Sequence, residues 1–172
     1  MEIRVLTEAD ASACRLLRLE GLRDYPTAFA SSYDEEREIA VGTVAERLGP
    51  TENGVVFGAF DGESLIGMVG IERERRSKLR HKALIWGMYV TPTCRRSGVG
   101  NRLLQSVLDY AATRMPGLKQ INLCVNTSST PAIEMYRRAG FEPFGVERAF
   151  LIVDDDPQDL IHMVRLIRIT RN

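Results

Sequence analysis

The spacing of hydrophobic residues along the chain changes several times, and each change predicts a different structural element. Near the start, residues 3–6 alternate between apolar and polar side chains, which predicts a short strand. A helical spacing follows and predicts a helix to about Asp24, with a capping box formed by Thr7 and Asp10 at its beginning. A second helix is predicted over residues 34–48, where a Gly-Pro pair ends it.

The second part of the chain first shows the pattern of strands and then alternates between helices and strands. An Asp-Gly pair supplies the turn of the first predicted hairpin, and a Pro-Gly pair stops the long helix. The predicted elements are strands at 55–60, 65–71 and 83–90, a helix from 99, a strand at 121–125, a helix at 130–139, and strands at 147–153 and 160–168. The order β-α-α-β-β-β-α-β-α-β-β, without a repeat or a linker, predicts one α/β domain over residues 1–172.

The composition is that of an ordinary globular domain and argues against several kinds of partner. Hydrophobic residues make up 44% and charged residues 27% of the chain, and 23 Lys and Arg residues balance 23 Asp and Glu residues. Without a net charge, nothing draws the whole chain to nucleic acid or to an anionic membrane. No stretch approaches the ~18 apolar residues that a membrane-spanning helix needs. We therefore expect no nucleic-acid partner and no membrane partner.

Cysteines and histidines are too few and too scattered for a metal site. Cys14, Cys94 and Cys124 lie far apart in the sequence, no CxxC pair occurs, and His81 and His162 are the only histidines. The acidic run before the last strand lacks the spacing of a calcium loop and is interpreted as a hairpin turn. Reduced thiols and a start without an apolar signal region predict a cytoplasmic protein.

The segment Arg95–Gly100 has the features of an anion-binding loop. It lies between a predicted strand and a predicted helix, and Gly98 and Gly100 permit a close approach that a Cβ would block. The first N–H groups of a helix lack partners and carry partial positive charge, so a pyrophosphate fits there, and Arg95 and Arg96 can add charge-assisted bonds. The Walker and dinucleotide patterns do not match. A tightly packed helix start without a ligand is the alternative explanation.

With its neighbouring segments, this loop resembles the acetyl-CoA signature of the GNAT-type N-acetyltransferases. The strand residues Met88–Pro92 precede Arg95-x-x-Gly98-x-Gly100, in the family pattern Q/R-x-x-G-x-G/A. Downstream, the strand around Leu123 and the run Pro131–Phe141, which ends in Y-x-x-x-G-F, are similar to the family's next strand and helix. The resemblance covers nearly the whole chain. It implies the GNAT-like acyl-CoA N-acyltransferase fold, an α/β fold with a mixed, mostly antiparallel sheet, splayed central parallel strands and flanking helices.

The resemblance also implies where acetyl-CoA, the expected co-substrate, binds. A bulge that is easily made at Gly87 would separate this strand from the next, so that main-chain groups of Met88, Tyr89 and Val90 face the pantetheine arm. One of those N–H groups could stabilise the oxyanion that forms on attack. The pyrophosphate is expected on the loop residues Arg95, Arg96, Ser97, Gly98, Val99, Gly100 and Asn101.

In the downstream helix, Tyr136 falls where many family members have a tyrosine near the CoA sulfur. A phenol with a pKa of about 10 can donate a proton to the departing thiolate, although a core aromatic would occupy the same helix face. Family members often have Asn seven residues earlier, whereas this chain has Ser129, so Asn126 is expected to take over part of that contact. Ala132 completes the contacts expected with the cofactor.

The sequence does not define the acceptor of the acetyl group. A small-molecule amine is slightly favoured over a protein N-terminus or lysine, because the chain has no accessory domain for a large partner. A non-catalytic acyl-CoA sensor and a phosphate-binding module without CoA are the alternatives from other classes. Phe29 and Tyr33, on the loop between the first two helices, either line the acceptor site or pin the loop to the core. A homodimer is also left open.

The predicted mechanism is direct attack of the amine on the acetyl carbon, but its general base is not evident. The strand at 83–90 contains no carboxylate. Glu35, Glu36 and Glu72 are candidates, each more typical of a solvated surface charge. No cysteine is placed for a covalent acetyl intermediate, and the alternation of the strand predicts that Cys124 is simply a buried side chain.

Overall fold

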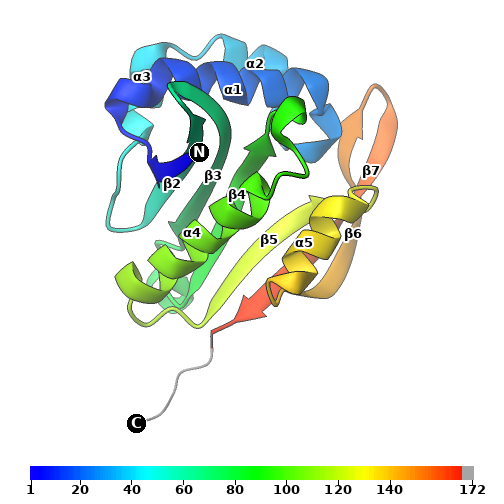
Figure 1. The fold of residues 1–172 in the computed structure, drawn as a ribbon. Helices are drawn as coiled ribbons and strands as arrows, with labels where there is room; N and C mark the ends of the chain where they lie inside the picture. The colour runs from blue at the N-terminus through cyan, green and yellow to red at the C-terminus, as the bar shows by residue number, and fades with distance from the viewer. Residues whose placement is uncertain (168–172) are drawn as a thin grey trace.

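The computed structural model describes residues 1–167, in which seven strands form one mixed sheet (Figure 1). The strand order is β1-β2-β3-β4-β5-β7-β6, and β4 and β5 are the parallel pair in an otherwise antiparallel sheet. This arrangement confirms the fold class expected from the sequence. The strands are β1 (Glu2–Val5), β2 (Gly54–Asp61), β3 (Ser64–Arg73), β4 (Lys82–Val90), β5 (Gln120–Asn126), β6 (Glu142–Val153) and β7 (Asp156–Leu166).

Helices pack on both faces of the sheet and bury separate cores. Val55 and Val69 belong to the core beneath α4 and α5, whereas Val56 and Met68, their neighbours along β2 and β3, belong to the core beneath α1. This alternation follows from the two-residue period of a strand. Within residues 1–167, no helix is both long and apolar enough to cross a membrane. The helices are α1 (Ala11–Asp24), α2 (Tyr33–Arg37), α3 (Val41–Arg47), α4 (Val99–Arg114) and α5 (Thr130–Arg138).

The parallel strands β4 and β5 are joined along only part of their length. Their register pairs begin at Lys82 and Gln120 and end at Leu84 and Asn122. Beyond that point the two strands separate, and the ribbon shows them diverging toward the end where α4 and α5 begin (Figure 1). The remaining main-chain groups on the facing edges of β4 and β5 are therefore not paired with each other, and this gap in the pairing is the opening between β4 and β5.

A bulge in β4 contributes to this separation. The register with β3 passes from Trp86 opposite Gly70 to Tyr89 opposite Met68, so two residues of β4 face one residue of β3. Gly87 lies in the bulge with φ of +64°, a conformation that favours glycine. The bulge expected at Gly87 is confirmed.

The predicted helix over residues 34–48 is wrong in one respect, because the structure contains two shorter helices there. α2 ends at Arg37, and Ala40 is extended with ψ of 146° before α3 begins. The side chain of Arg15 on α1 donates to the carbonyls of Arg37 and Ile39, at 2.5 and 2.8 Å, and so satisfies groups that a continuous helix would bond internally. This long-range contact stabilises the break between the helices.

The last hairpin starts earlier than its hydrophobic pattern indicates. β6 begins at Glu142 rather than near residue 147, and its first nine residues are exposed. Two register shifts with β7 further disturb the alternation that would mark a strand. The acidic run forms the predicted turn, with φ of 51° at Asp154 and 63° at Asp155, as in a type I′ hairpin. The last predicted strand extends to Arg168, which lies outside the described residues.

Candidate active site

The start of α4 presents main-chain donors at the wide end of the opening. Gly98 is the N-cap residue, with φ of +87°, and the first backbone bond of the helix runs from the Arg102 N–H to the Gly98 carbonyl at 3.1 Å. The N–H groups of Val99, Gly100 and Asn101 therefore have no acceptor within the helix. Together with the helix dipole they form an anion site of the size of a phosphate group.

Close packing between α4 and α5 explains the second glycine of the loop. A Cβ added to Gly100 would lie 3.2 Å from the Sδ atom of Met135 on α5. α5 starts at the same end of the strands β4 and β5 as α4 does, so the two helix starts flank the wide end of the opening (Figure 1). The loop and α5 thus form one wall around the expected position of the donor.

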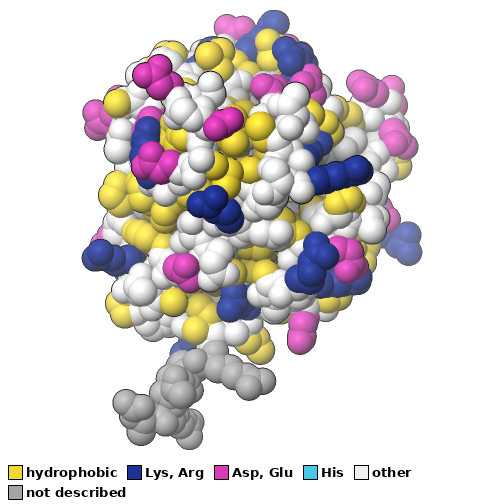
Figure 2. All heavy atoms as spheres, viewed as in Figure 1, with side chains coloured by type: hydrophobic (Ala, Val, Ile, Leu, Met, Phe, Trp, Pro, Cys, Tyr) yellow, Lys and Arg dark blue, Asp and Glu magenta, His cyan; other side chains and the backbone are white. Residues whose placement is uncertain are grey.

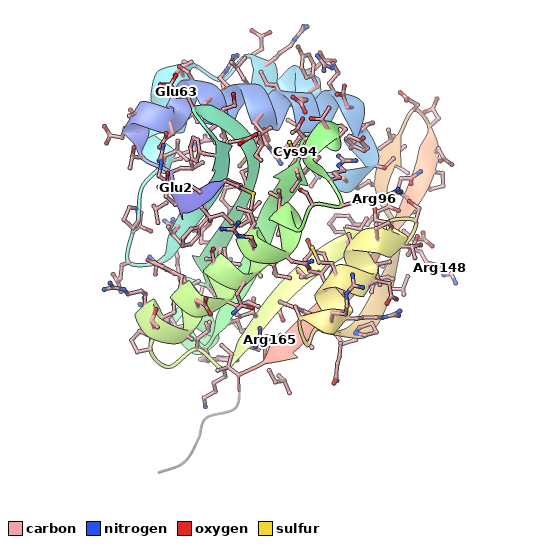
Figure 3. The ribbon with its side chains drawn as sticks, viewed as in Figure 1. Glu2, Glu63, Cys94, Arg96, Arg148 and Arg165 are labelled. Carbon is pink, nitrogen blue, oxygen red and sulfur yellow. The ribbon has the colours of Figure 1, made fainter. Side chains whose placement is uncertain are left out.

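The arginines of the loop differ in their surroundings. Arg95 donates through Nε to the Val90 carbonyl at 2.9 Å, and its guanidinium lies 4.1 Å from the ring centroid of Tyr25. Arg96 is exposed and has φ of +62°, and Figure 3 shows it on the loop between β4 and α4. Ser97 uses its hydroxyl to donate to the Cys94 carbonyl at 2.6 Å. Arg96 is therefore the loop arginine whose guanidinium is most available to a phosphate.

Charge over the rest of this face is mixed. Figure 2 shows Lys and Arg side chains interspersed with Asp and Glu rather than gathered in one patch. The loop's attraction for an anion is therefore a local property of the helix start and its arginines.

The strand residues predicted to contact the pantetheine arm line the opening. Met88, Tyr89 and Val90 follow the bulge and lie beyond the last residue of β4 that pairs with β5. The side chain of Tyr89 points to the α1 side, where its hydroxyl donates to Glu20 at 2.9 Å. Burial, and after it this hydrogen bond, raises the pKa of Tyr89. Its main chain, rather than its phenol, is what the strand offers to a cofactor.

Tyr136 lies on α5 within the core that faces α4. Its ring is 5% exposed and meets Phe141 edge-on at 5.9 Å between centroids. Burial raises the pKa of its phenol, so the hydroxyl stays protonated at neutral pH. No hydrogen bond to this hydroxyl occurs within residues 1–167. A protonated phenol without a protein partner is suited to donate to a leaving group, and its catalytic role stays a prediction.

The polar residues at the end of β5 are arranged differently from expectation. The Asn126 amide donates to the Thr27 carbonyl at 3.1 Å and to Gln158 at 3.2 Å, and its oxygen accepts from the main chain and hydroxyl of Ser128. These four bonds use the hydrogen-bonding capacity of the side chain. A cofactor contact by Asn126 would have to come from its main chain. Ser129 is the N-cap residue of α5, and its hydroxyl forms no capping bond.

Ala132 and the two predicted loop aromatics have less polar surroundings. Ala132 is partly buried against the core that Tyr136 joins. Phe29 is 9% exposed, and the Arg18 guanidinium lies 4.6 Å from its ring centroid. Tyr33 begins α2 and packs against the same α1 core. Phe29 therefore pins the loop to the core, and contact of either aromatic with an acceptor stays a prediction.

A cavity of about 260 Å³ lies on the α1 side of the sheet and was not predicted from the sequence. It extends from α1 and α3 to Trp86 on β4 and Met68 on β3. A Cβ added to Gly87 would lie 3.9 Å from Met68 Cε and 4.0 Å from Arg18 Nη1, so the bulge adjoins residues that line the cavity. The opening between β4 and β5 therefore has a donor side at α4 and a second side beneath α1.

Charged residues on this second side are mostly arginines. Arg15, Arg18 and Arg47 line the cavity together with one carboxylate, Glu36. Glu36 is bound to Arg18, with 2.9 Å between Oε1 and Nη2. Its pKa is lowered even though burial opposes this, because the Arg18 guanidinium stabilises the carboxylate. The cavity therefore carries an excess of positive charge.

The candidate bases named from the sequence all have other partners. Glu36 is held by Arg18, Glu35 caps α2 through Ser32, and Glu72 is exposed beside Arg75 at 2.9 Å. A carboxylate in an ion pair is a weaker base than a free one. None of the three is favoured by this geometry.

Cys124 departs from its predicted environment. Leu123 and Val125 are buried toward α5, whereas Cys124 points to the opposite face and is exposed. The prediction of a buried side chain is wrong, because strand alternation places Cys124 on the uncovered side of β5. Its Sγ lies 3.1 Å from Nδ1 of His162, a contact between residues far apart in the sequence. In the described part of the chain, no group of three His, Cys, Asp or Glu side chains could hold a metal ion.

Comparison with known proteins agrees with this geometry. The model of the acetyltransferase (GNAT) family matches residues 17–141. The chain belongs to the GNAT acetyltransferase family. The fold class, the enzyme class and acetyl-CoA as the donor, all expected from the sequence, are thereby confirmed for this domain.

Individual relatives show how far the likeness extends. The N-alpha-acetyltransferase RimI of Mycobacterium tuberculosis is 30% identical over 151 residues, which are 86% of this chain and 82% of RimI. An uncharacterized protein of Mycobacterium leprae is 32% identical over 147 residues, and the match spans 35% of that longer protein. The structure of yncA from Salmonella typhimurium with its cofactor acetyl-CoA has a TM-score of 0.81 at 16% identity, covering 100% of this chain and 96% of that one.

Proposed function

We propose that this GNAT domain transfers the acetyl group of acetyl-CoA to a primary amine of a small molecule by direct attack. The observation that carries the proposal is the opening between β4 and β5. An anion-binding helix start lies at its end, and the cavity beneath α1 adjoins its bulge. Donor and acceptor can therefore approach the same point from opposite faces of the sheet, as a direct transfer requires.

On the donor side, the pyrophosphate of acetyl-CoA would lie on the N–H groups of Val99, Gly100 and Asn101, with Arg96 beside it. The pantetheine arm would follow the free main-chain groups of β4 from Val90 toward the bulge. A main-chain N–H at Met88 would stabilise the oxyanion. The protonated phenol of Tyr136 would then donate to the departing sulfur.

On the acceptor side, the cavity favours a molecule with an apolar body and an anionic group. Its lining combines apolar side chains such as Leu19 and Trp86 with three arginines and one carboxylate. A carboxylate on the acceptor would be attracted by these guanidinium groups, whereas a polyamine would be repelled. The relationship to RimI supports a second candidate, an amine at the N-terminus of a protein.

An acceptor screen tests this function. Acetyl-CoA binding is first measured by calorimetry, and release of the CoA thiol is then followed with amino acids, spermidine and a peptide with an N-terminal alanine. We expect small amines that carry a carboxylate to react fastest. Preference for the peptide would assign the second candidate, and binding without turnover would assign a sensor. Absence of acetyl-CoA binding would overturn the proposal.

We also propose that the protein acts in the cytoplasm. The structure contains Cys14, Cys94 and Cys124 as free thiols, which is typical of a reducing compartment. Fractionation of the source cells with an antibody to the protein would test this location.

A further inference from the structure

Three side chains from the last three strands form a hydrogen-bonded chain on the α1 side of the sheet. Cys124 on β5 and His162 on β7 are direct register partners, and Sγ lies 3.1 Å from Nδ1. On the other side of the imidazole, Nε2 lies 2.8 Å from Oε2 of Glu147 on β6. No local sequence pattern indicates these contacts, because the partners are separated by 38 and 15 residues.

The carboxylate of Glu147 determines which imidazole nitrogen holds the proton. An ionised carboxylate can only accept a hydrogen bond, so Nε2 is the donor in the neutral imidazole. Nδ1 then carries the lone pair and faces Cys124. Because β5 lies between β7 and β4, this basic nitrogen points toward the opening in the sheet.

Cys124 lies on the wall of that opening. The last register pair between β4 and β5 is that of Leu84 and Asn122, and Cys124 lies two residues further along β5. Its side chain is on the face opposite Leu123 and Val125, the same face on which Trp86 lines the cavity. The thiol therefore lies between the acceptor side of the opening and the imidazole.

We propose that His162, oriented by Glu147, is the general base of the transfer and receives the proton of the acceptor ammonium through the Cys124 thiol. This inference rests on the proposed function. It fills the role for which the geometry does not favour Glu35, Glu36 or Glu72. Cys124 and His162 would be the catalytic groups, and Glu147 would be a positioning residue.

The proton movements balance. The thiol passes its proton to Nδ1 and takes one from the ammonium, which leaves a neutral amine, an unchanged thiol and an imidazolium beside Glu147. The amine lone pair forms the C–N bond and the C–S bond breaks. Tyr136 protonates the sulfur and regains a proton from the new amide nitrogen. His162, whose side chain is 26% exposed, then releases the one net proton to water.

The surroundings of these three hydrogen-bonded side chains agree with a proton relay rather than with a covalent intermediate. Partial desolvation of the Sγ atom, and after it the charge of Glu147, raises the pKa of the Cys124 thiol, so no standing thiolate is present at neutral pH. The titratable groups facing the imidazole are Cys124 from β5 and Glu147 from β6. The rings of Phe144 and Phe150 pack against it at 5.8 and 6.2 Å. Asp159, earlier on β7, lies 3.7 Å from Arg148.

The pH dependence of kcat/KM tests the base, with the amine that the acceptor screen identifies. The wild-type kcat/KM should rise with pH and then level off, and this ascending limb of the profile should reflect deprotonation of an imidazole. His162→Gln should lower kcat by about 100-fold or more and abolish that limb. Glu147→Gln should lower kcat while keeping the limb, since the imidazole then loses the acceptor that orients it. His81→Gln is the matched control and should leave the profile unchanged.

Further measurements separate catalysis from structural support. Imidazole added to His162→Gly should restore turnover, which a purely structural histidine would not allow, and acetyl-CoA affinity should remain within about 2-fold of wild type. Retention of the limb in His162→Gln would overturn the inference. So would a kinetically competent acetyl-Cys124 adduct in the intact mass. Binding of acetyl-CoA without turnover of any amine overturns the proposed function, and the relay with it, whereas turnover with an unchanged profile overturns the relay alone.

Discussion

Tyr136 combines a buried ring with a hydroxyl that has no protein partner within residues 1–167. Replacing it by Phe removes only the hydroxyl and leaves the edge-on contact with Phe141. We expect Tyr136→Phe to lower kcat about 100-fold, because the sulfur then leaves as a thiolate without a proton donor. The dissociation constant for acetyl-CoA should change by less than about 2-fold. Steady-state kinetics and calorimetry measure the two quantities.

The control for this change is Tyr110→Phe, which alters a partly buried tyrosine on the opposite end of the α4 core. It should leave kcat unchanged. Because burial raises the pKa of Tyr136, its acid form persists through neutral pH, and the wild-type rate should not decline until well above pH 10. Equal activity of the Tyr136→Phe enzyme would remove this phenol from the mechanism.

Gly100 presents a different requirement, that of space between two helices. An added Cβ would meet Met135 Sδ at 3.2 Å, so Gly100→Ala forces α5 or the methionine to shift. We expect acetyl-CoA affinity to fall about 10-fold, which corresponds to about 1.4 kcal/mol. Gly145→Ala is the matched control, since its Cβ would meet nothing within 4 Å. Calorimetric titration measures the acetyl-CoA affinity of both variants. Equal affinities would mean that the loop tolerates a side chain at this position.

Among the elements, the start of α1 depends on a buried carboxylate. Asp10 accepts two bonds from the Arg4 guanidinium, at 2.8 and 2.7 Å, and one from the Thr7 N–H at 2.8 Å. The Arg4 bonds, followed by those of Thr7, lower the pKa of Asp10 despite its burial. A lowered folded-state pKa adds stability above the unfolded value near 3.9, and this stability is lost as the pH falls below it.

Asp10→Asn should therefore lower the free energy of unfolding by about 1 kcal/mol at pH 7, as expected for the loss of a helix cap. The difference from wild type should shrink as the pH is lowered from 5 toward 2. Urea unfolding at several pH values measures it. Glu8→Gln, an exposed residue of the same turn, should show no such dependence. A difference that stays constant with pH would show that ionisation of Asp10 contributes nothing.

The elements also show what a sequence pattern can and cannot reveal. The Thr7–Asp10 box and the α4 stripe depend on neighbours in the chain and were predictable from it, whereas the Gly87 bulge was implied by the family resemblance. The break between α2 and α3 depends on Arg15, which lies 24 residues from Ile39. The contact of Cys124 with His162 likewise needs the strand order to be known. Local rules predicted the anion-binding loop and the resemblance implied the rest of the donor side, whereas the acceptor side is assembled from contacts distant in sequence.

At the scale of the whole molecule, the opening divides the sheet into two parts. Strands β1 to β4 lie on one side and β5, β7 and β6 on the other, and their direct register ends at Leu84 and Asn122. Asn126 adds a link from β5 to Thr27 and Gln158. A cofactor that bonds the free edges of both parallel strands would complete the missing connection between the two parts.

Acetyl-CoA should consequently stabilise the protein as a whole and protect the opening in particular. At a concentration 100 times its dissociation constant, mass action adds about 2.7 kcal/mol, which corresponds to a rise in Tm of roughly 5–10 °C for a chain of this size. Hydrogen exchange should slow most at residues 85–90 and 123–126, where β4 and β5 are not paired with each other. Residues 57–60 of β2, already paired on both sides, serve as the internal reference. A Tm rise with protection spread evenly over the sheet would place the cofactor elsewhere, because only a ligand within the opening supplies partners to those two edges.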